Sequence, residues 1–319
     1  MTTIKKLEEF YYGDLKATLN SIEKERKNSI NRMMKSLFKC TVIFLLIGLV
    51  VVLITGESKY LMVVFGFYCM FAQGTYGAAA SDYNNNFKES IINPLVKSID
   101  ESLVYSKGEH ISQEDFVKSE LLKVPDSVSG DDYVSGEIEG VKIEFSDLKA
   151  QTKSIDKDKK VKYSTYFKGF FIKSSFNRSF QGKTFVLPET SLSTFGSFFG
   201  NWIQSMKTNK GELVKMDNDQ FEREFVVYSS DQVEARYILT PIMMERLLDF
   251  KKKSIHPIYI SFIDDCIHII IDNNKNNFEA TLFRSILDYD IAFEYILNIH
   301  LASSLINNLK LNEKLWGEK

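Results

Sequence analysis

The chain has 319 residues, a formal net charge of -2, and a hydrophobic content of 44%. This length allows a sizeable core and one or two folded units. Because the net charge is close to zero, there is no bulk attraction to nucleic acid, and we expect no nucleic-acid partner. The three cysteines, Cys40, Cys69 and Cys266, are widely spaced and form no C-x-x-C pair. This spacing argues against a disulfide framework or a zinc site and fits a reducing compartment.

Two apolar runs dominate the first quarter of the chain. Residues 40–55 carry no charge and reach a spanning length of about 19 residues when 37–39 are added. Residues 60–80 form a second uncharged run, and only "GESK" at 56–59 separates the two. We predict a transmembrane helical hairpin over residues 37–81, with spans at about 37–55 and 60–80. The alternative is a helical hairpin buried in a soluble protein.

Charged residues beside the first run predict the orientation of this hairpin. Residues 16–39 contain seven Lys or Arg residues and two Glu residues. The positive-inside rule places this side in the cytoplasm, and two crossings return the chain to the same side. We therefore predict a multi-pass protein in the lipid bilayer with both termini in the cytoplasm.

The second apolar run carries small residues that allow another helix to approach closely. Gly74 and Ala78 have small-xxx-small spacing, and Gly66 and Gly77 lie in the same run. Two interpretations remain open: packing against the first span of the same chain, or self-association between copies.

Apolar residues recur at helical spacing on both sides of the hairpin. Residues 1–36 predict an amphipathic cytoplasmic helix, and residues 82–123 continue with a matching stripe that Pro94 is expected to bend. We expect the two segments to pair as an antiparallel stalk. A helix that lies on the lipid headgroups is the alternative for residues 1–36. Later in the second segment, Ser112 predicts the start of a short helix.

Residues 124–319 predict a cytoplasmic domain of mixed sheet and helix, so the fold class is α+β. Thr240 and Pro241 have the residue types of an N-cap and a first helical position, which predicts a helix over 241–253. Asp217 predicts the cap of a shorter helix, and apolar spacing predicts a C-terminal helix over 290–309. The aromatic-rich residues 191–206 are expected to cover the sheet. Strands are predicted within residues 132–153, 161–176, 182–189, 211–216, 224–231, 232–239 and 257–272.

The sequence contains no motif for phosphate, metal or nucleophilic chemistry. It has no glycine-rich phosphate loop, no H-E-x-x-H pair and no G-x-S-x-G elbow, so we expect no metal or cofactor. The four histidines are scattered, and His268 is expected on the solvated face of a strand. Cys266 is expected to be a half-buried thiol whose pKa is raised by neighbouring carboxylates.

Two charged clusters remain as candidate interaction sites. Asp231, Glu234 and Arg236 form the first, and on a strand Glu234 and Arg236 share one face and would form an ion pair. An adjacent arginine lowers the pKa of a carboxylate and disfavours base catalysis at pH 7. The second cluster is a small anion patch that comprises Lys173, Arg178 and Lys183, for which solvated strand ends are the alternative.

The region around the first cluster also carries a family resemblance. "GELVKMDNDQFEREFVVYSSDQVEARYILTPIMMERLL", residues 211–248, resembles the characteristic block of a bacterial family, domain of unknown function 3137. "ISFIDDCIHIIID" and "LKLNEKLW" are similar to its later segments, and the N-terminal hairpin resembles its arrangement. The likeness extends in order over most of the chain. It implies a bacterial inner-membrane protein with no assigned activity, catalytic residue or cofactor.

These features favour a membrane-anchored cytoplasmic module that binds or scaffolds another membrane-associated protein, or associates with itself. The alternative is a membrane-tethered enzyme with a site built from Asp231, Glu234, Arg236 and His268. A third hypothesis is a sensor of a small ligand or lipid headgroup that uses Lys173, Arg178 and Lys183.

Overall fold

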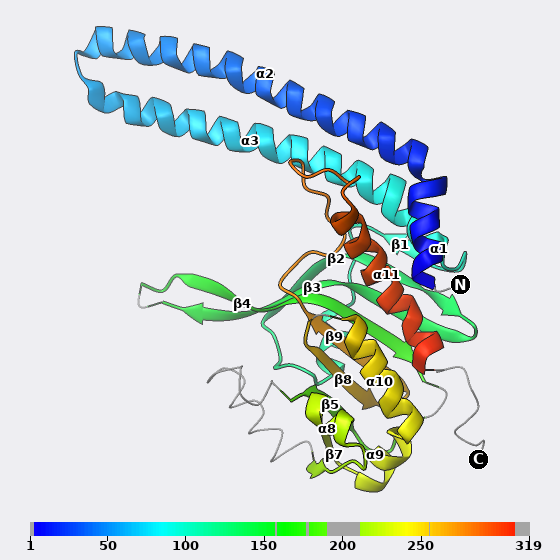
Figure 1. Cartoon of the computed structure of the whole chain (residues 1–319). Coiled ribbons are helices and arrows are strands. Elements are labelled where there is room, and N and C mark those ends of the chain that lie inside the picture. The colour runs from blue at the N-terminus through cyan, green and yellow to red at the C-terminus, as the bar shows by residue number, and fades with distance from the viewer. Residues whose placement is uncertain (1–2, 157, 177–178, 190–210, 255, 310–319) are drawn as a thin grey trace. The chain divides into compact units, whose positions relative to one another are not determined.

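The computed structural model describes the chain except for residues 1–2, 157, 177–178, 190–210, 255 and 310–319 (Figure 1). The aromatic-rich stretch at 191–206 therefore lies outside the described residues. The chain divides into two compact units. The helical unit comprises residues 8–95 and 278–294, and the sheet unit comprises residues 1–7, 96–277 and 295–319. Helices and an antiparallel sheet together give the α+β class that the sequence predicts.

Two long helices dominate the helical unit. The first, α2, ends where Gly56 adopts the left-handed conformation at a φ of 67°, which confirms the predicted tight turn. The elements in chain order are α1 (Thr3–Glu9), η1 (Phe10–Asp14), α2 (Lys16–Thr55), η2 (Ser58–Tyr60), α3 (Leu61–Phe87), η3 (Lys88–Ile92) and α4 (Asn93–Lys97).

Both long helices expose apolar surface. Only 6% of the most apolar 18-residue window in Lys16–Thr55 is buried, and 0% of the corresponding window in Ser58–Lys97. By length and composition, both helices are long and apolar enough to cross a membrane. A core helix of a soluble protein would bury such a window, so the exposure favours the transmembrane hairpin over the buried alternative.

The two helices of the hairpin lie side by side (Figure 1). Thr41 and Tyr68 share a hydrogen bond of 3.0 Å between their hydroxyl oxygens, and Asn86 donates to Glu25 further along. The described part of residues 1–36 therefore continues into a helix that pairs with α3, as the stalk interpretation expects.

Pro94 changes the helix without ending it. Proline has no backbone N–H, and its ring crowds the carbonyl four residues earlier. The preceding turn, Lys88–Ile92, is a π-helix, which is a common way to accommodate a local disruption of the hydrogen-bond ladder. The helix resumes at Asn93, so the predicted weak point is a π-helical turn.

Nine described strands form one antiparallel sheet in the order β1-β2-β3-β4-β9-β8-β5-β7-β6. Both edge strands, β1 and β6, have only three residues each, which limits unpaired backbone at the edges. The strands are β1 (Val104–Ser106), β2 (Ser127–Ile138), β3 (Val141–Ile155), β4 (Val161–Ser175), β5 (Thr184–Pro188), β6 (Glu212–Val214), β7 (Phe225–Ser229), β8 (Ile258–Ile263) and β9 (Cys266–Asp272).

The described helices of the sheet unit begin at residues suited to capping. Ser112 and Thr240 accept backbone N–H bonds as the sequence predicts, whereas Asn218 takes the role predicted for Asp217. The helices are α5 (Gln113–Lys118), α8 (Asp219–Glu224), α9 (Gln232–Ile238) and α10 (Pro241–Lys253). The last helix, α11 (Tyr289–Leu309), begins in the helical unit and continues in the sheet unit.

Aromatic side chains fill one layer of the core of the sheet unit. Phe116 on α5 packs against Phe167 and Phe171 on β4, with ring centroids 5.8 and 5.6 Å apart. All three are almost fully buried, which contributes roughly 1.5–3 kcal/mol for each side chain. Burial alternates with exposure along β3 before the strand becomes buried on both faces.

The segment predicted as a strand at residues 232–239 is a helix, so that prediction is wrong. Asp231 caps α9 by accepting the N–H groups of Val233 and Glu234 at 2.9 and 3.0 Å. Ala235 and Ile238 are buried at helical spacing, whereas Val233 is exposed. The alternating apolar residues of this short stretch fit both periods, and the Asp231 cap favours the helix.

One segment from late in the chain belongs to the helical unit. Residues 278–294, which the sequence places in the C-terminal domain, belong to the helical unit. Arg26 donates to the carbonyl of Leu282 at 2.9 Å, and Ala280 donates to the side chain of Asn84 at 2.9 Å. These contacts join residues about 200 to 250 positions apart.

Candidate functional site

The β3–β4 hairpin, residues 151–165, forms an exposed ribbon in the sheet unit. A bulge between Ala150 and Gln151 marks its base, and its strands pair from Gln151 with Thr165 to Ile155 with Val161. From Lys153 to Thr165, every described residue is exposed. Figure 1 shows the hairpin extending away from the rest of the sheet.

One face of this ribbon is apolar. Cross-strand partners share a face, and residues two positions apart on a strand also share it. Lys153 pairs with Tyr163, and Ile155 pairs with Val161, so these four side chains share one face. The exposed fractions of Ile155, Val161 and Tyr163 are 68%, 51% and 50%. This apolar face is the first candidate site of the sheet unit.

A second candidate is a carboxylate cluster at a bulge between β2 and β3. Asp131 and Asp147 are direct register partners, and the register shifts between Asp131 and Val134. Asp132 within the bulge has a φ of 59° and is fully buried. One carboxylate oxygen from each of the three aspartates lies within 4.8 Å of the others. Gly130 is needed beside them, because a Cβ there would lie 2.0 Å from the carbonyl oxygen of Asp147.

The cluster is held by neighbouring hydrogen-bond donors. Asn277 donates from its backbone N–H and its side-chain amide to the two oxygens of Asp147, and Tyr105 donates to Asp132. Burial raises the pKa of Asp147 well above its ordinary value, and the charges of Asp132 and Asp131 raise it further, against the effect of Asn277. These carboxylates can share a proton, and their oxygens are of the type that Mg²⁺ or Ca²⁺ prefers.

A cleft of about 270 Å³ borders this cluster. Asp131 and Asp147 line it together with Lys149 and Lys168, which are register partners on β3 and β4. The sequence interpretation did not identify this site. The neighbouring pair Asp131 and Asp132 was a visible signal, but the register that brings Asp147 opposite them cannot be read from spacing alone.

The first predicted cluster has a structural arrangement different from the expected one. Both carboxylate oxygens of Glu234 accept backbone N–H groups, from Gln181 at 3.0 Å and Gly182 at 2.7 Å. Arg236 instead donates to the carbonyl of Gln232 at 3.2 Å. The predicted Glu234–Arg236 ion pair is therefore wrong, because residues two apart on a helix do not face each other.

The residues of the enzyme hypothesis are held in different places. His268 on β9 is buried and lies 3.4 Å from the hydroxyl of Ser261, so its predicted solvated position is wrong. Burial lowers the pKa of His268 to about 4, and the nearby Lys173 lowers it too. Strand β7, which leads into Asp231 and Glu234, is three strands from β9, about 14 Å at ordinary strand spacing.

Cys266 matches the sequence expectation. It is half-buried, and burial followed by the charge of Asp265 raises its pKa to about 12. A thiol of this kind is a poor nucleophile at neutral pH.

Two members of the predicted anion patch already contact carboxylates. Lys173 lies 2.9 Å from Asp115, and Lys183 lies 2.7 Å from Glu120. Arg178 lies outside the described residues. Both described lysines of the patch are therefore paired with carboxylates, and the anion patch stays a prediction.

The glycines of α3 face open space in the structure. A Cβ placed on Gly66, Gly74 or Gly77 would meet no atom within 4 Å, and Ala78 is exposed. Gly48 on α2 is the glycine at the contact, since its Cβ would lie 3.0 Å from Leu61. The three glycines therefore make no close contact with α2, and the two packing interpretations stay predictions.

The described residues define an α+β protein that combines a long apolar helical hairpin with a nine-stranded antiparallel sheet. Residues 165–311 match the family model described as "Protein of unknown function (DUF3137)". The resemblance is confirmed there, and the apolar hairpin lies outside the matched residues. No curated protein matches the chain.

Among solved structures, the chain has a distant likeness to the crystal structure of the mycobacterial trehalose monomycolate transport factor A, TtfA. The TM-score is 0.35 and the sequence identity 11%, with 67% of this chain and 93% of that chain covered.

Proposed function

We propose that the protein is a membrane-anchored module that binds another membrane-associated protein through the β3–β4 ribbon. The exposed apolar face formed by Ile155, Val161 and Tyr163 is the observation that carries partner binding. Burial of these three side chains against a partner would contribute several kcal/mol at roughly 25 cal/mol per Å² of apolar surface.

The anchor is supported by the apolar surface of the helical unit. Side chains such as Leu45, Leu53 and Phe65 are 69%, 74% and 65% exposed along α2 and α3. Apolar surface on this scale, over helices of spanning length, is stable in a bilayer and unstable in water. The positive charge of residues 16–39 supports a cytoplasmic sheet unit at the inner membrane of a bacterium.

The ribbon also suggests the chemistry of the partner. Lys153 shares the apolar face of the ribbon with Ile155, Val161 and Tyr163. We therefore expect a partner surface with an apolar centre and acidic residues at its edge, since complementary charges guide association.

Site-specific photo-crosslinking tests this function. A photoreactive amino acid at position 163 should give a discrete crosslinked product in membranes that contain the full chain. The matched control is position 162, which is adjacent and exposed but faces the other way. If positions 155, 161 and 163 give no product, or no more than position 162, the ribbon is not a partner-binding surface.

A further inference from the structure

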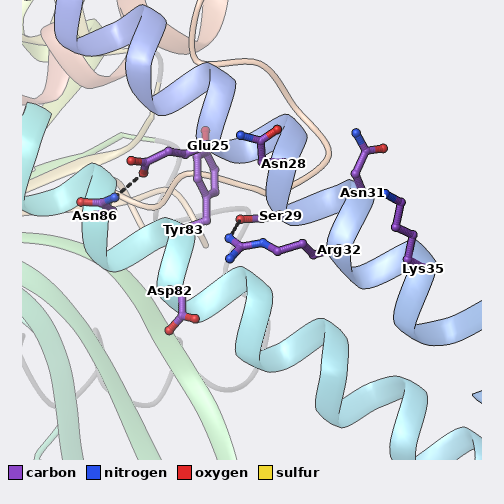
Figure 2. A pocket seen from close by; sticks show the side chains of 9 residues that line it. All are labelled: Glu25, Asn28, Ser29, Asn31, Arg32, Lys35, Asp82, Tyr83 and Asn86. Atoms are coloured by element: carbon purple, nitrogen blue, oxygen red, sulfur yellow. Dashed lines mark hydrogen bonds between the residues drawn. The ribbon is translucent and has the colours of Figure 1, made fainter.

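A polar cleft lies between α2 and α3 in the helical unit, and residues of both helices line it (Figure 2). Its volume is about 630 Å³. The side chains that line it include Glu25, Ser29, Arg32, Lys35, Asp82 and Asn86.

The cleft contains two cations that form no ion pair among the described residues. Arg32 donates to the hydroxyl of Ser29 at 3.1 Å, and Figure 2 shows its side chain between the two helices. Lys35 lies one turn further along α2 and is exposed. The carboxylate of Glu25 is bound by Asn86, which leaves Asp82 as the second acidic group of the cleft. The two cations and two carboxylates of this cleft balance in number, and neither cation forms an ion pair with another described residue.

The cleft lies at the depth of lipid headgroups if the hairpin spans a membrane. Lys35 and Arg32 precede the expected span at Leu37 by two and five residues, about 3 and 8 Å along a helix. Asp82 follows the other span at Ala80 by two residues. The headgroup layer is roughly 5–8 Å thick on each side of the hydrocarbon core, so these side chains would lie within it.

We propose that this cleft binds the phosphate group of a membrane phospholipid. Arg32 would hold two phosphate oxygens with its planar guanidinium, and Lys35 would supply a second charge. Ser29 and the neighbouring asparagines offer hydrogen-bond donors for the remaining oxygens. The proposal rests on the membrane hairpin of the proposed function and assigns a lipid ligand to its cytoplasmic end.

The test compares two double variants of the full chain with equal charge. Arg32→Gln with Lys35→Gln removes the cations of the cleft. Lys24→Gln with Lys39→Gln removes two exposed cations of the same helix outside it. The protein is reconstituted in phospholipid nanodiscs, transferred to detergent, and the retained lipid is counted by native mass spectrometry.

We expect the cleft variant to retain about tenfold less phospholipid, which corresponds to one lost charge-assisted contact. The control variant should retain as much as the wild type. Equal losses in the two variants would indicate general electrostatic attraction and overturn the site. Equal retention of diacylglycerol, which lacks phosphate, would also overturn it.

Flotation with vesicles separates this proposal from the proposed function. If no variant floats, the membrane hairpin itself is wrong. If all variants float and retain lipid equally, the hairpin stands and the headgroup site is wrong. Both cations are exposed, so the far-ultraviolet circular dichroism of the variants should match that of the wild type.

Discussion

Buried carboxylates in the sheet unit are stabilised by two different arrangements. Glu234 is 8% exposed and accepts a backbone N–H group on each of its two oxygens. Asp147 is also buried and accepts two bonds from Asn277, but it lies opposite another aspartate. The first arrangement satisfies a negative charge, whereas the second places like charges next to each other.

Glu234→Gln should lower the stability of the protein, because one of the two N–H groups loses its acceptor. The expected loss is about 1–3 kcal/mol, the usual effect of a buried hydrogen bond to a charged group. Arg236→Gln is the matched control on the same helix, because Arg236 is exposed. Thermal unfolding of the full chain followed by circular dichroism measures both. If Arg236→Gln is as destabilising as Glu234→Gln, the two side chains act together after all.

Asp147 should make stability depend on pH in a defined direction. Its pKa is raised in the folded protein by burial and by Asp132 and Asp131, so the folded state holds a proton that the unfolded chain releases above about pH 4. Stability contributed by this proton is therefore present at low pH and is lost as pH rises through the folded pKa. Asp147→Asn should remove this loss, so the variant gains stability relative to the wild type as pH rises.

The comparison with the variant is necessary because other groups titrate nearby. Burial lowers the pKa values of His268 and His300 to about 4, which makes stability rise between about pH 4 and 6.5, the opposite direction. Denaturant unfolding at several pH values, in the wild type and in Asp147→Asn, isolates the aspartate. If the unfolding free energies of the wild type and of Asp147→Asn change in parallel with pH, Asp147 does not hold the additional proton in the folded state. Stabilisation of the wild type alone by Mg²⁺ or Ca²⁺ would indicate a bound cation instead.

A helix can be predicted from local sequence when the residues at its start are recognisable as a cap. The bounds of α10 agree with the predicted helix at 241–253, because Thr240 and Pro241 signal the start without any distant contact. The neighbouring α9 was predicted as a strand, because its apolar residues alternate and its cap, Asp231, was read as part of a charged cluster. A seven-residue element is too short for periodicity to decide.

Thr240→Ala should weaken α10 without changing its core contacts. The hydroxyl of Thr240 accepts the N–H of Met243 at 3.3 Å, and loss of an N-cap costs about 1 kcal/mol. For a domain of this size, the melting temperature should fall by about 2–4 °C. Thr240→Ser keeps the acceptor and should stay close to the wild type. If the serine and alanine variants melt together, the cap does not stabilise the helix.

At the scale of the whole molecule, the sequence predicts the features that depend on local pattern and not on which distant residues contact each other. The apolar runs, the β8–β9 turn at Asp264 and the C-terminal helix all follow from local pattern, and the structure has them. The strand order and the place of residues 278–294 depend on contacts between distant residues. For the same reason, the carboxylate cluster and the cleft beside Arg32 could not be identified from the sequence alone.

The proposed topology can be tested with single cysteines and a membrane-impermeant maleimide. Cys69 lies exposed on α3, near the middle of the expected second span, and Ser58 lies in the turn between the spans. In bacterial spheroplasts, Ser58→Cys should be labelled from outside, and Lys24→Cys should be labelled only after permeabilisation. Cys69 should stay unlabelled until detergent is added, because maleimide needs a hydrated thiolate and the bilayer core holds no water. Labelling of Cys69 without detergent would exclude an embedded hairpin. Labelling of Lys24→Cys in intact spheroplasts would instead reverse the orientation and place the sheet unit, with its ribbon, outside the cytoplasm.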